Sequence, residues 1–243
     1  MVHPEQFGGS DGLRWEQDDG HILLVVGGKA LLRLAPEMVA VGRGRPNIRM
    51  YRGNFAIEDA PEMMPLRHAS RGVGDEVLLS EREGESPLLS LRIEANGPEG
   101  GKLRLQALAP ALDRITIRFA ELAGEDLSGG GEQMSYLRLN GQRFPIWTSE
   151  PGVGRDKSDP FTQAMDAAAM AGGDYWTTNY PQPTVMASSG IALHLDAACY
   201  SVIDASGAGA SMSNPPSASL NVWDGSRKIS VGASASITCG SVT

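Results

Sequence analysis

The sequence predicts an all-β protein, an antiparallel β-sandwich forming a single domain over residues 1–243. Several segments alternate apolar and polar residues, most clearly residues 114–121, where Ile115, Ile117 and Phe119 share one face. Such alternation is typical of an antiparallel sheet with one face in the core. Glycine-rich turn signals separate these segments, and no alternation of strands with helices suggests a parallel barrel. We expect roughly a dozen strands, joined by turns.

The first elements are a hairpin, in which residues 21–26 and 29–34 flank Gly27-Gly28, a pair that favours a two-residue loop. Later strands are expected at residues 77–79, 88–95, 103–107, 114–121, 191–197, 200–205, 219–223 and 228–242. The strand at residues 114–121 places Arg114, Thr116 and Arg118 on its polar face.

The last strand is expected to be less stable than the middle of the sheet. Its inward positions shrink to Val231, Ala233 and Ala235, and small side chains bury little apolar area.

One helix is expected, inside a long stretch that we call the insertion (residues 129–184). Asp159 suits the N-cap, Pro160 the first helical position and Gly172-Gly173 the stop after the Ala- and Met-rich residues 161–171. The rest of the insertion follows no helix or strand period. Such long loops are usually functional or disordered, and a high content of Trp and Tyr argues against disorder. The sandwich is therefore expected to present this insertion.

Composition excludes several classes of protein. The net charge of −8 and the pI near 5.0 argue against a nucleic-acid partner, which requires a basic face. No apolar run reaches the ~20 residues that cross a bilayer, and the N-terminal residues lack a secretory signal. The two cysteines, Cys199 and Cys239, are too few for a disulfide framework. We expect a cytoplasmic protein without a membrane partner.

No familiar catalytic or cofactor motif is present in the sequence. It contains no phosphate-binding loop, no dinucleotide fingerprint and no nucleophile elbow. The histidines at positions 3, 21, 68 and 194 lack the spacing of metal ligands. The prediction is no cofactor and no metal.

Four blocks in the insertion carry a specific resemblance. They are GEQMSY (131–136), FPIWTSEPGVGR (144–155), AGGDYW (171–176) and YPQPT (180–184), and YRGNF (51–55) and YSV (200–202) fit the same pattern. Together they resemble the N-terminal domain of glycoside hydrolase family 31, and within it the sulfoquinovosidases. The resemblance is strong across the insertion, weak before Tyr51 and fading after Tyr200.

The resemblance implies a retaining α-glycosidase that releases sulfoquinovose from sulfoquinovosyl glycerol and related glycosides. In that family both catalytic aspartates lie on a (β/α)8 barrel that follows the sandwich, and a barrel needs about 250 residues. We expect this chain to lack the barrel, so it is interpreted as a truncated or split chain that is inactive alone, and no catalytic residue is assigned. The expected partners are the carbohydrate and a barrel in cis or in trans. Whether the chain is itself an enzyme is left open.

The resemblance also implies a loop that leans over the mouth of the barrel, for which the turn at residues 149–155 is the candidate. Glu150 would accept hydrogen bonds from leaving-group hydroxyls, because a carboxylate is an acceptor. Arg155 would orient Glu150 or the loop, unless the two residues simply pair within it. Trp147 either stacks on sugar or packs beneath the loop. Gln133, next to Glu132, contacts ligand or satisfies backbone groups of the loop.

The predicted substrate-binding residues are therefore Glu150, Arg155, Gln133 and Trp147. The alternatives to a glycosidase domain are a stand-alone carbohydrate-binding module without catalysis and a purely structural domain.

Overall fold

The structure is a computed structural model. It describes residues 5–9, 12–19, 21–35, 38–51, 54–95, 100–119, 122, 124–132, 135–149, 154–196, 200–206, 218–223 and 234–241. The described part contains twenty strands and one helix, more strands than the roughly one dozen expected.

The elements, in chain order, are β1 (Glu5–Gly9), β2 (Leu13–Asp18), β3 (His21–Val26), β4 (Lys29–Leu34), β5 (Val39–Arg43), β6 (Asn47–Tyr51), β7 (Asn54–Glu58), β8 (Glu62–Leu66), β9 (His68–Arg71), β10 (Glu76–Ser80), β11 (Leu89–Ala95), β12 (Gly100–Ala107), β13 (Arg114–Phe119), β14 (Leu127–Gly131), β15 (Arg143–Ile146), α1 (Pro160–Ala169), β16 (Pro181–Ala187), β17 (Ile191–Asp196), β18 (Tyr200–Asp204), β19 (Ala218–Trp223) and β20 (Ser234–Ser241).

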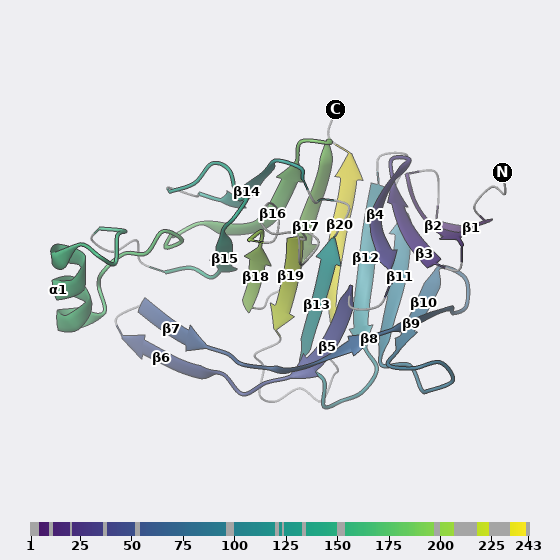
Figure 1. Ribbon diagram of the computed structural model, residues 1–243, viewed down its shortest axis with the longest axis horizontal. Helices are drawn as coiled ribbons and strands as arrows, with labels where there is room; N and C mark the ends of the chain where they lie inside the picture. The colour runs from purple at the N-terminus through teal and green to yellow at the C-terminus, as the bar shows by residue number, and fades with distance from the viewer. Residues whose placement is uncertain are drawn as a thin grey trace.

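These strands form three larger sheets and one separate hairpin (Figure 1). The largest sheet has the order β14-β16-β17-β20-β12-β11-β10-β9, the second β15-β18-β19-β13-β5-β8 and the third β1-β2-β3-β4. The hairpin β6–β7 pairs with none of these three sheets. One cluster of buried side chains draws on all three larger sheets, including Trp15, Leu91 and Phe144. The predicted all-β sandwich with a single short helix is confirmed.

The β3–β4 hairpin has the predicted two-residue loop. Gly27 and Gly28 both have positive φ, 55° and 81°, as a type I′ turn requires. The prediction for residues 21–34 is confirmed.

Arg114 departs from the predicted polar face of β13. Its side chain is only 4% exposed, and its Nε and Nη2 donate to the two carboxylate oxygens of Asp59 at 2.9 and 3.2 Å. Its Nη1 also lies 3.1 Å from Asp113 Oδ1, which accepts from the amide of Gly44. The prediction of a solvent-facing Arg114 is wrong, because the carboxylate of the distant Asp59 and that of the neighbouring Asp113 bind its guanidinium.

Helix α1 begins as predicted and ends earlier than predicted. Asp159 Oδ2 accepts from the amide of Thr162 at 3.0 Å, so Asp159 is the N-cap. The last helical residue is Ala169, and Met170 is the C-cap, which adopts the left-handed conformation with φ of 51°. Gly172 is not the stop, since its amide donates to Asp166 Oδ1 at 3.0 Å.

The insertion is more regular than the sequence suggests, because β15 and parts of β14 and β16 lie within it. At the other end of the chain, β20 pairs with β12 and β17 near the middle of the largest sheet. Cys199, Val231 and Ala233 lie outside the described residues, so the lower stability of the last strand stays a prediction. No helix in the described part of the chain is long and apolar enough to span a membrane.

Candidate functional site

The candidate site lies where the insertion leaves the sheets. We call residues 147–180, which carry α1, the arm. In Figure 1 the arm reaches away from the sheets and places α1 at the opposite end of the molecule from β1 and β2. The hairpin β6–β7 extends toward the same end, and residues of both segments line one cavity. The arm and the hairpin therefore enclose a common space.

That cavity has a volume of about 480 Å³, within the range of small-molecule sites. Its aromatic lining residues are Phe55, Trp147, Tyr175, Trp176 and Tyr200, and its charged lining residues are Arg49, Glu58, Arg143, Lys157, Asp166 and Asp174. Each of the three cationic lining residues has a carboxylate neighbour, in the pairs Arg49–Glu58, Lys157–Asp166 and Arg143–Asp204. The space thus combines aromatic surface with both signs of charge.

Trp147 lies at the junction of the hairpin and the arm. Its ring meets Phe55 edge-on at a centroid distance of 5.4 Å and Tyr200 at 5.8 Å. Its Nε1 is buried and meets no acceptor within the described structure. The ring therefore packs between the hairpin and β18, and its donor faces no acceptor among the described residues. Whether it also stacks on sugar or packs beneath the loop at residues 149–155 stays a prediction.

Arg155 binds two backbone carbonyls of the arm. Its Nη1 donates to the carbonyl oxygens of Asp174 at 3.0 Å and Thr177 at 2.9 Å. The guanidinium thereby ties the start of the arm to its return segment. The other two predicted residues, Gln133 and Glu150, lie outside the described residues, so their positions stay predictions.

The segments that precede Gln133 and Glu150 meet on one stretch of chain, residues 178–180. The Ser149 amide donates to Thr178 O at 3.1 Å, and the Glu132 amide donates to Tyr180 O at 3.0 Å. The Thr178 hydroxyl also donates to Glu132 Oε2 at 3.4 Å. Sequence reasoning missed Thr178, which lies just outside the quoted blocks.

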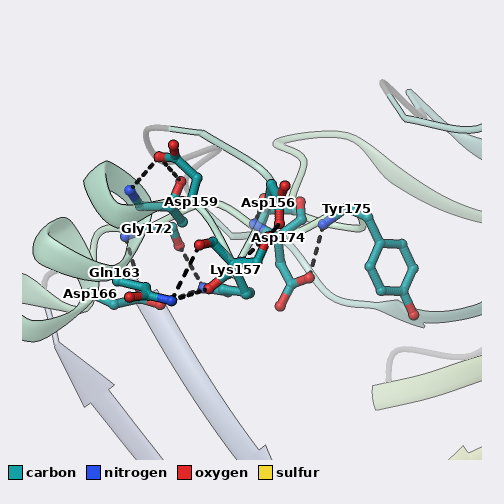
Figure 2. Close-up of polar contacts among 11 residues, drawn as sticks. Asp156, Lys157, Asp159, Gln163, Asp166, Gly172, Asp174 and Tyr175 are labelled. Carbon is teal, nitrogen blue, oxygen red and sulfur yellow. Dashed lines mark hydrogen bonds and ion pairs between the residues drawn. The ribbon is translucent and has the colours of Figure 1, made fainter.

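Polar contacts hold the outer part of the arm, as Figure 2 shows. Lys157 Nζ donates to Asp166 Oδ2 at 2.7 Å and to Gly172 O at 3.2 Å. The side-chain Nε2 of Gln163 donates to Lys157 O at 3.0 Å. Within α1 only Thr162 is buried. The outer arm is therefore held mainly by hydrogen bonds and an ion pair, with little apolar packing of its helix.

Burial raises the pKa of two tyrosines beside the cavity, Tyr175 and Tyr200. For Tyr175 the nearby charge of Asp174 acts in the same direction, and its hydroxyl donates to Arg143 O at 2.6 Å. Because the folded pKa is raised, the stabilisation from the neutral phenols is complete below the unfolded value of about 10. It is lost as the pH rises through the folded pKa.

An alkaline titration is therefore expected to show phenols that ionise later than free tyrosine, whose pKa is about 10. Ultraviolet absorbance of the phenolate measures this directly in the folded protein. The substitutions Tyr175→Phe and Tyr200→Phe should each remove part of the late-titrating amplitude. If neither substitution changed the late part of the curve, the assignment would be wrong.

The carboxyl groups of Glu5, Glu76, Glu94 and Asp156 have a lowered pKa, chiefly through side-chain hydrogen bonds from Arg71, Ser90, Arg104 and Ser158. None of these four residues lines the cavity. Among the described residues, no group of three or more His, Cys, Asp or Glu is placed to hold a metal ion.

Comparison with known proteins identifies close relatives, although no protein-family model matches the chain. It is 43% identical over 195 residues to a sulfoquinovosidase of Agrobacterium fabrum, covering 79% of this chain and 28% of that protein. It is 38% identical over 168 residues to a sulfoquinovosidase of Escherichia coli, covering 68% of this chain and 24% of that protein.

A solved structure agrees with these sequence relatives. A family 31 sulfoquinovosidase from E. rectale, in complex with an aza-sugar inhibitor, superposes with a TM-score of 0.73 at 34% identity. The match covers 93% of this chain and 32% of that one. The chain thus spans only 24% to 32% of the length of these relatives. On sequence and fold together, the chain belongs to glycoside hydrolase family 31, where its relatives are sulfoquinovosidases.

Proposed function

We propose that residues 1–243 form one β-sandwich domain of a retaining α-glycosidase that hydrolyses α-sulfoquinovosides such as sulfoquinovosyl glycerol. The observation that carries the proposal is the 43% identity to a sulfoquinovosidase over 79% of the chain. The domain acts with a (β/α)8 barrel, in cis or in trans, and helps to shape the side of the sugar site that holds the leaving group. Its place in the cytoplasm stays a prediction.

The proposed sugar-facing residues come from the insertion. Glu150 accepts hydrogen bonds from leaving-group hydroxyls, and Gln133 contributes a second polar contact. Trp147 offers an indole donor that meets no acceptor among the described residues. Arg155 contributes by holding the arm against Asp174 and Thr177.

The chemistry itself is assigned to the barrel. Retaining hydrolysis needs two carboxyl groups about 5 Å apart across the sugar, one of which acts as an acid. The chain alone is therefore expected to be inactive.

Two measurements on the isolated chain test this assignment. A nitrophenyl α-sulfoquinovoside should release no chromophore above the background rate, because the catalytic pair is supplied elsewhere. Calorimetric titration with sulfoquinovosyl glycerol should show weak binding that Glu150→Ala reduces, and Lys29→Ala, which changes an exposed residue of the β3–β4 hairpin, is the control. Turnover that persists after rigorous purification would contradict the assignment of the chemistry to the barrel.

The second candidate function is a stand-alone carbohydrate-binding module. The cavity of about 480 Å³ with its aromatic lining favours it, since aromatic rings with a polar edge are suited to sugar. The coding sequence beyond the codon for Thr243 separates the two candidates. A reading frame that continues into a barrel supports the glycosidase domain, and a stop codon with no barrel gene nearby supports the module.

A further inference from the structure

Two predicted site residues lie far apart in the sequence, and their described neighbours are hydrogen-bonded to the same stretch of chain. Gln133 directly follows Glu132, whose amide donates to Tyr180 O at 3.0 Å. Glu150 directly follows Ser149, whose amide donates to Thr178 O at 3.1 Å. The last described residue before each of them is therefore bonded within the same three residues, 178–180.

The Thr178 end of this stretch is buried and its polar groups are engaged, whereas Tyr180 is 70% exposed. Ser149, Thr177 and Thr178 are only 4%, 6% and 1% exposed. The Thr178 hydroxyl has two bonds, since it donates to Glu132 Oε2 at 3.4 Å and accepts from the Tyr180 amide at 3.2 Å. Leaving a buried polar group without its partner is costly, so these bonds define one local arrangement.

Arg155 braces the same stretch from its N-terminal side. Its Nη1 donates to Thr177 O at 2.9 Å, one residue before Thr178, and to Asp174 O at 3.0 Å. The Thr177 hydroxyl closes this turn by donating to Asp174 O at 2.8 Å. A planar guanidinium holds such a pair of carbonyls in a fixed geometry, which a flexible ammonium does less well.

We infer that residues 177–180 are a shared support that holds Glu132 and Ser149, the described neighbours of Gln133 and Glu150, and that Arg155 and Thr178 are positioning residues of the proposed sugar site. The inference rests on the proposed function for the sugar and on the hydrogen bonds above for the support. Arg155 then acts through the backbone rather than by touching the glycoside. Thr178 joins the Glu132 side to the Ser149 side.

The support is tested first without any ligand, by amide hydrogen exchange of the folded chain. In Thr178→Val, which keeps the shape, the hydroxyl no longer holds Glu132 Oε2 and the Tyr180 amide. The Glu132 amide, which donates to Tyr180 O, should therefore exchange about tenfold faster. In Arg155→Met the Ser149 amide should exchange faster by a similar factor. Thr178→Ser keeps the hydroxyl and should restore wild-type exchange to within about twofold.

Two controls separate positioning from general loss of stability. Lys157→Met removes a different contact of the arm, the bonds to Asp166 and Gly172, and should leave the Glu132 and Ser149 amides unchanged. The amide of Ile93, which donates to Asp75 O far from the arm, should exchange at the wild-type rate in every variant.

Titration with sulfoquinovosyl glycerol then tests the positioning role. Thr178→Val and Arg155→Met should each weaken binding about tenfold, whereas Thr178→Ser should bind within about twofold of wild type. Faster exchange with unchanged affinity would overturn the positioning role, and unchanged exchange would overturn the support. A wild-type chain that binds no glycoside would refute the proposed sugar site and with it the positioning role, and the exchange rates would still decide the support.

Discussion

Arg114→Met is expected to lower the free energy of unfolding by about 3–5 kcal/mol, the usual cost of breaking a buried ion pair from one side. The substitution leaves Asp59, whose side chain is only 15% exposed, without the guanidinium that binds both of its oxygens. Asp113 loses a cation at the same time. Because Asp59 directly follows β7, the same bonds fasten the base of the β6–β7 hairpin to β13. Urea denaturation of the purified variant measures the loss.

Arg43→Met is the matched control, because Arg43 lies in the neighbouring strand β5 and its partner is Glu62. The two side chains are 69% and 79% exposed, and exposed pairs contribute about 0–1 kcal/mol. Adding Asp59→Leu to Arg114→Met removes the stranded carboxylate and should recover part of the stability. Equal losses for Arg114→Met and Arg43→Met would refute the account.

Arg114 also shows what alternation in a sequence cannot reveal. The period-2 pattern of β13 correctly placed Ile115, Ile117 and Phe119 in the core. The same pattern wrongly assigned Arg114 to solvent, because its partner Asp59 is 55 positions away. A periodic pattern reports which face a residue occupies, and it contains no information on which distant segment covers that face.

The hairpin β6–β7 was not predicted, for a related reason. It joins none of the three larger sheets, so it has no continuous core face that would force alternation. Ile48 and Met50 are 47% and 62% exposed. A two-stranded hairpin is marginal by itself in water, and this one is held through Phe55 on Trp147 and Asp59 on Arg114. Its strands thus depend on tertiary contacts that local patterns do not encode.

Strand β14 was hidden by its composition. Gly129, Gly130 and Gly131 all have positive φ, and such a glycine run resembles a turn. A Cβ at Gly129 would overlap Thr184 O, and one at Gly131 would overlap Tyr180 O. The glycines therefore permit close approach to β16, a known role of glycine within strands. Strand β15 contains Pro145 and lies at the edge of its sheet, where proline is tolerated.

The candidate site was located from the sequence only as far as its blocks of residues. Of the motif containing Trp147 and Arg155, Trp147 lines the cavity and Arg155 binds the arm's backbone, and their role in sugar binding stays a prediction. The contacts of Arg155 with two carbonyls, and the part played by Thr178, required the folded chain. Backbone acceptors leave no mark in a sequence, because every residue carries one.

Trp15→Ala is expected to cost about 3–5 kcal/mol of stability, as for other large side chains removed from a core. Trp15 is among the largest fully buried side chains of the protein, on strand β2. Its Nε1 also donates to Asp75 O at 3.1 Å, which ties the four-stranded sheet to the segment leading into β10. The loss combines a cavity with a missing hydrogen bond. Urea denaturation followed by circular dichroism measures it.

Trp15→Phe separates the two contributions, because it keeps an aromatic ring in the core and removes the donor, so it should cost clearly less than Trp15→Ala. Leu108→Ala, at a residue that is 41% exposed, should cost under about 1 kcal/mol. If Trp15→Ala were no more harmful than Leu108→Ala, the four-stranded sheet would not share the core of the sandwich. Since β2, which carries Trp15, lies at the end away from the arm (Figure 1), sugar binding by the fraction that stays folded should be unaffected. Stability and binding would then vary independently, as expected if the sandwich core and the arm perform separate tasks.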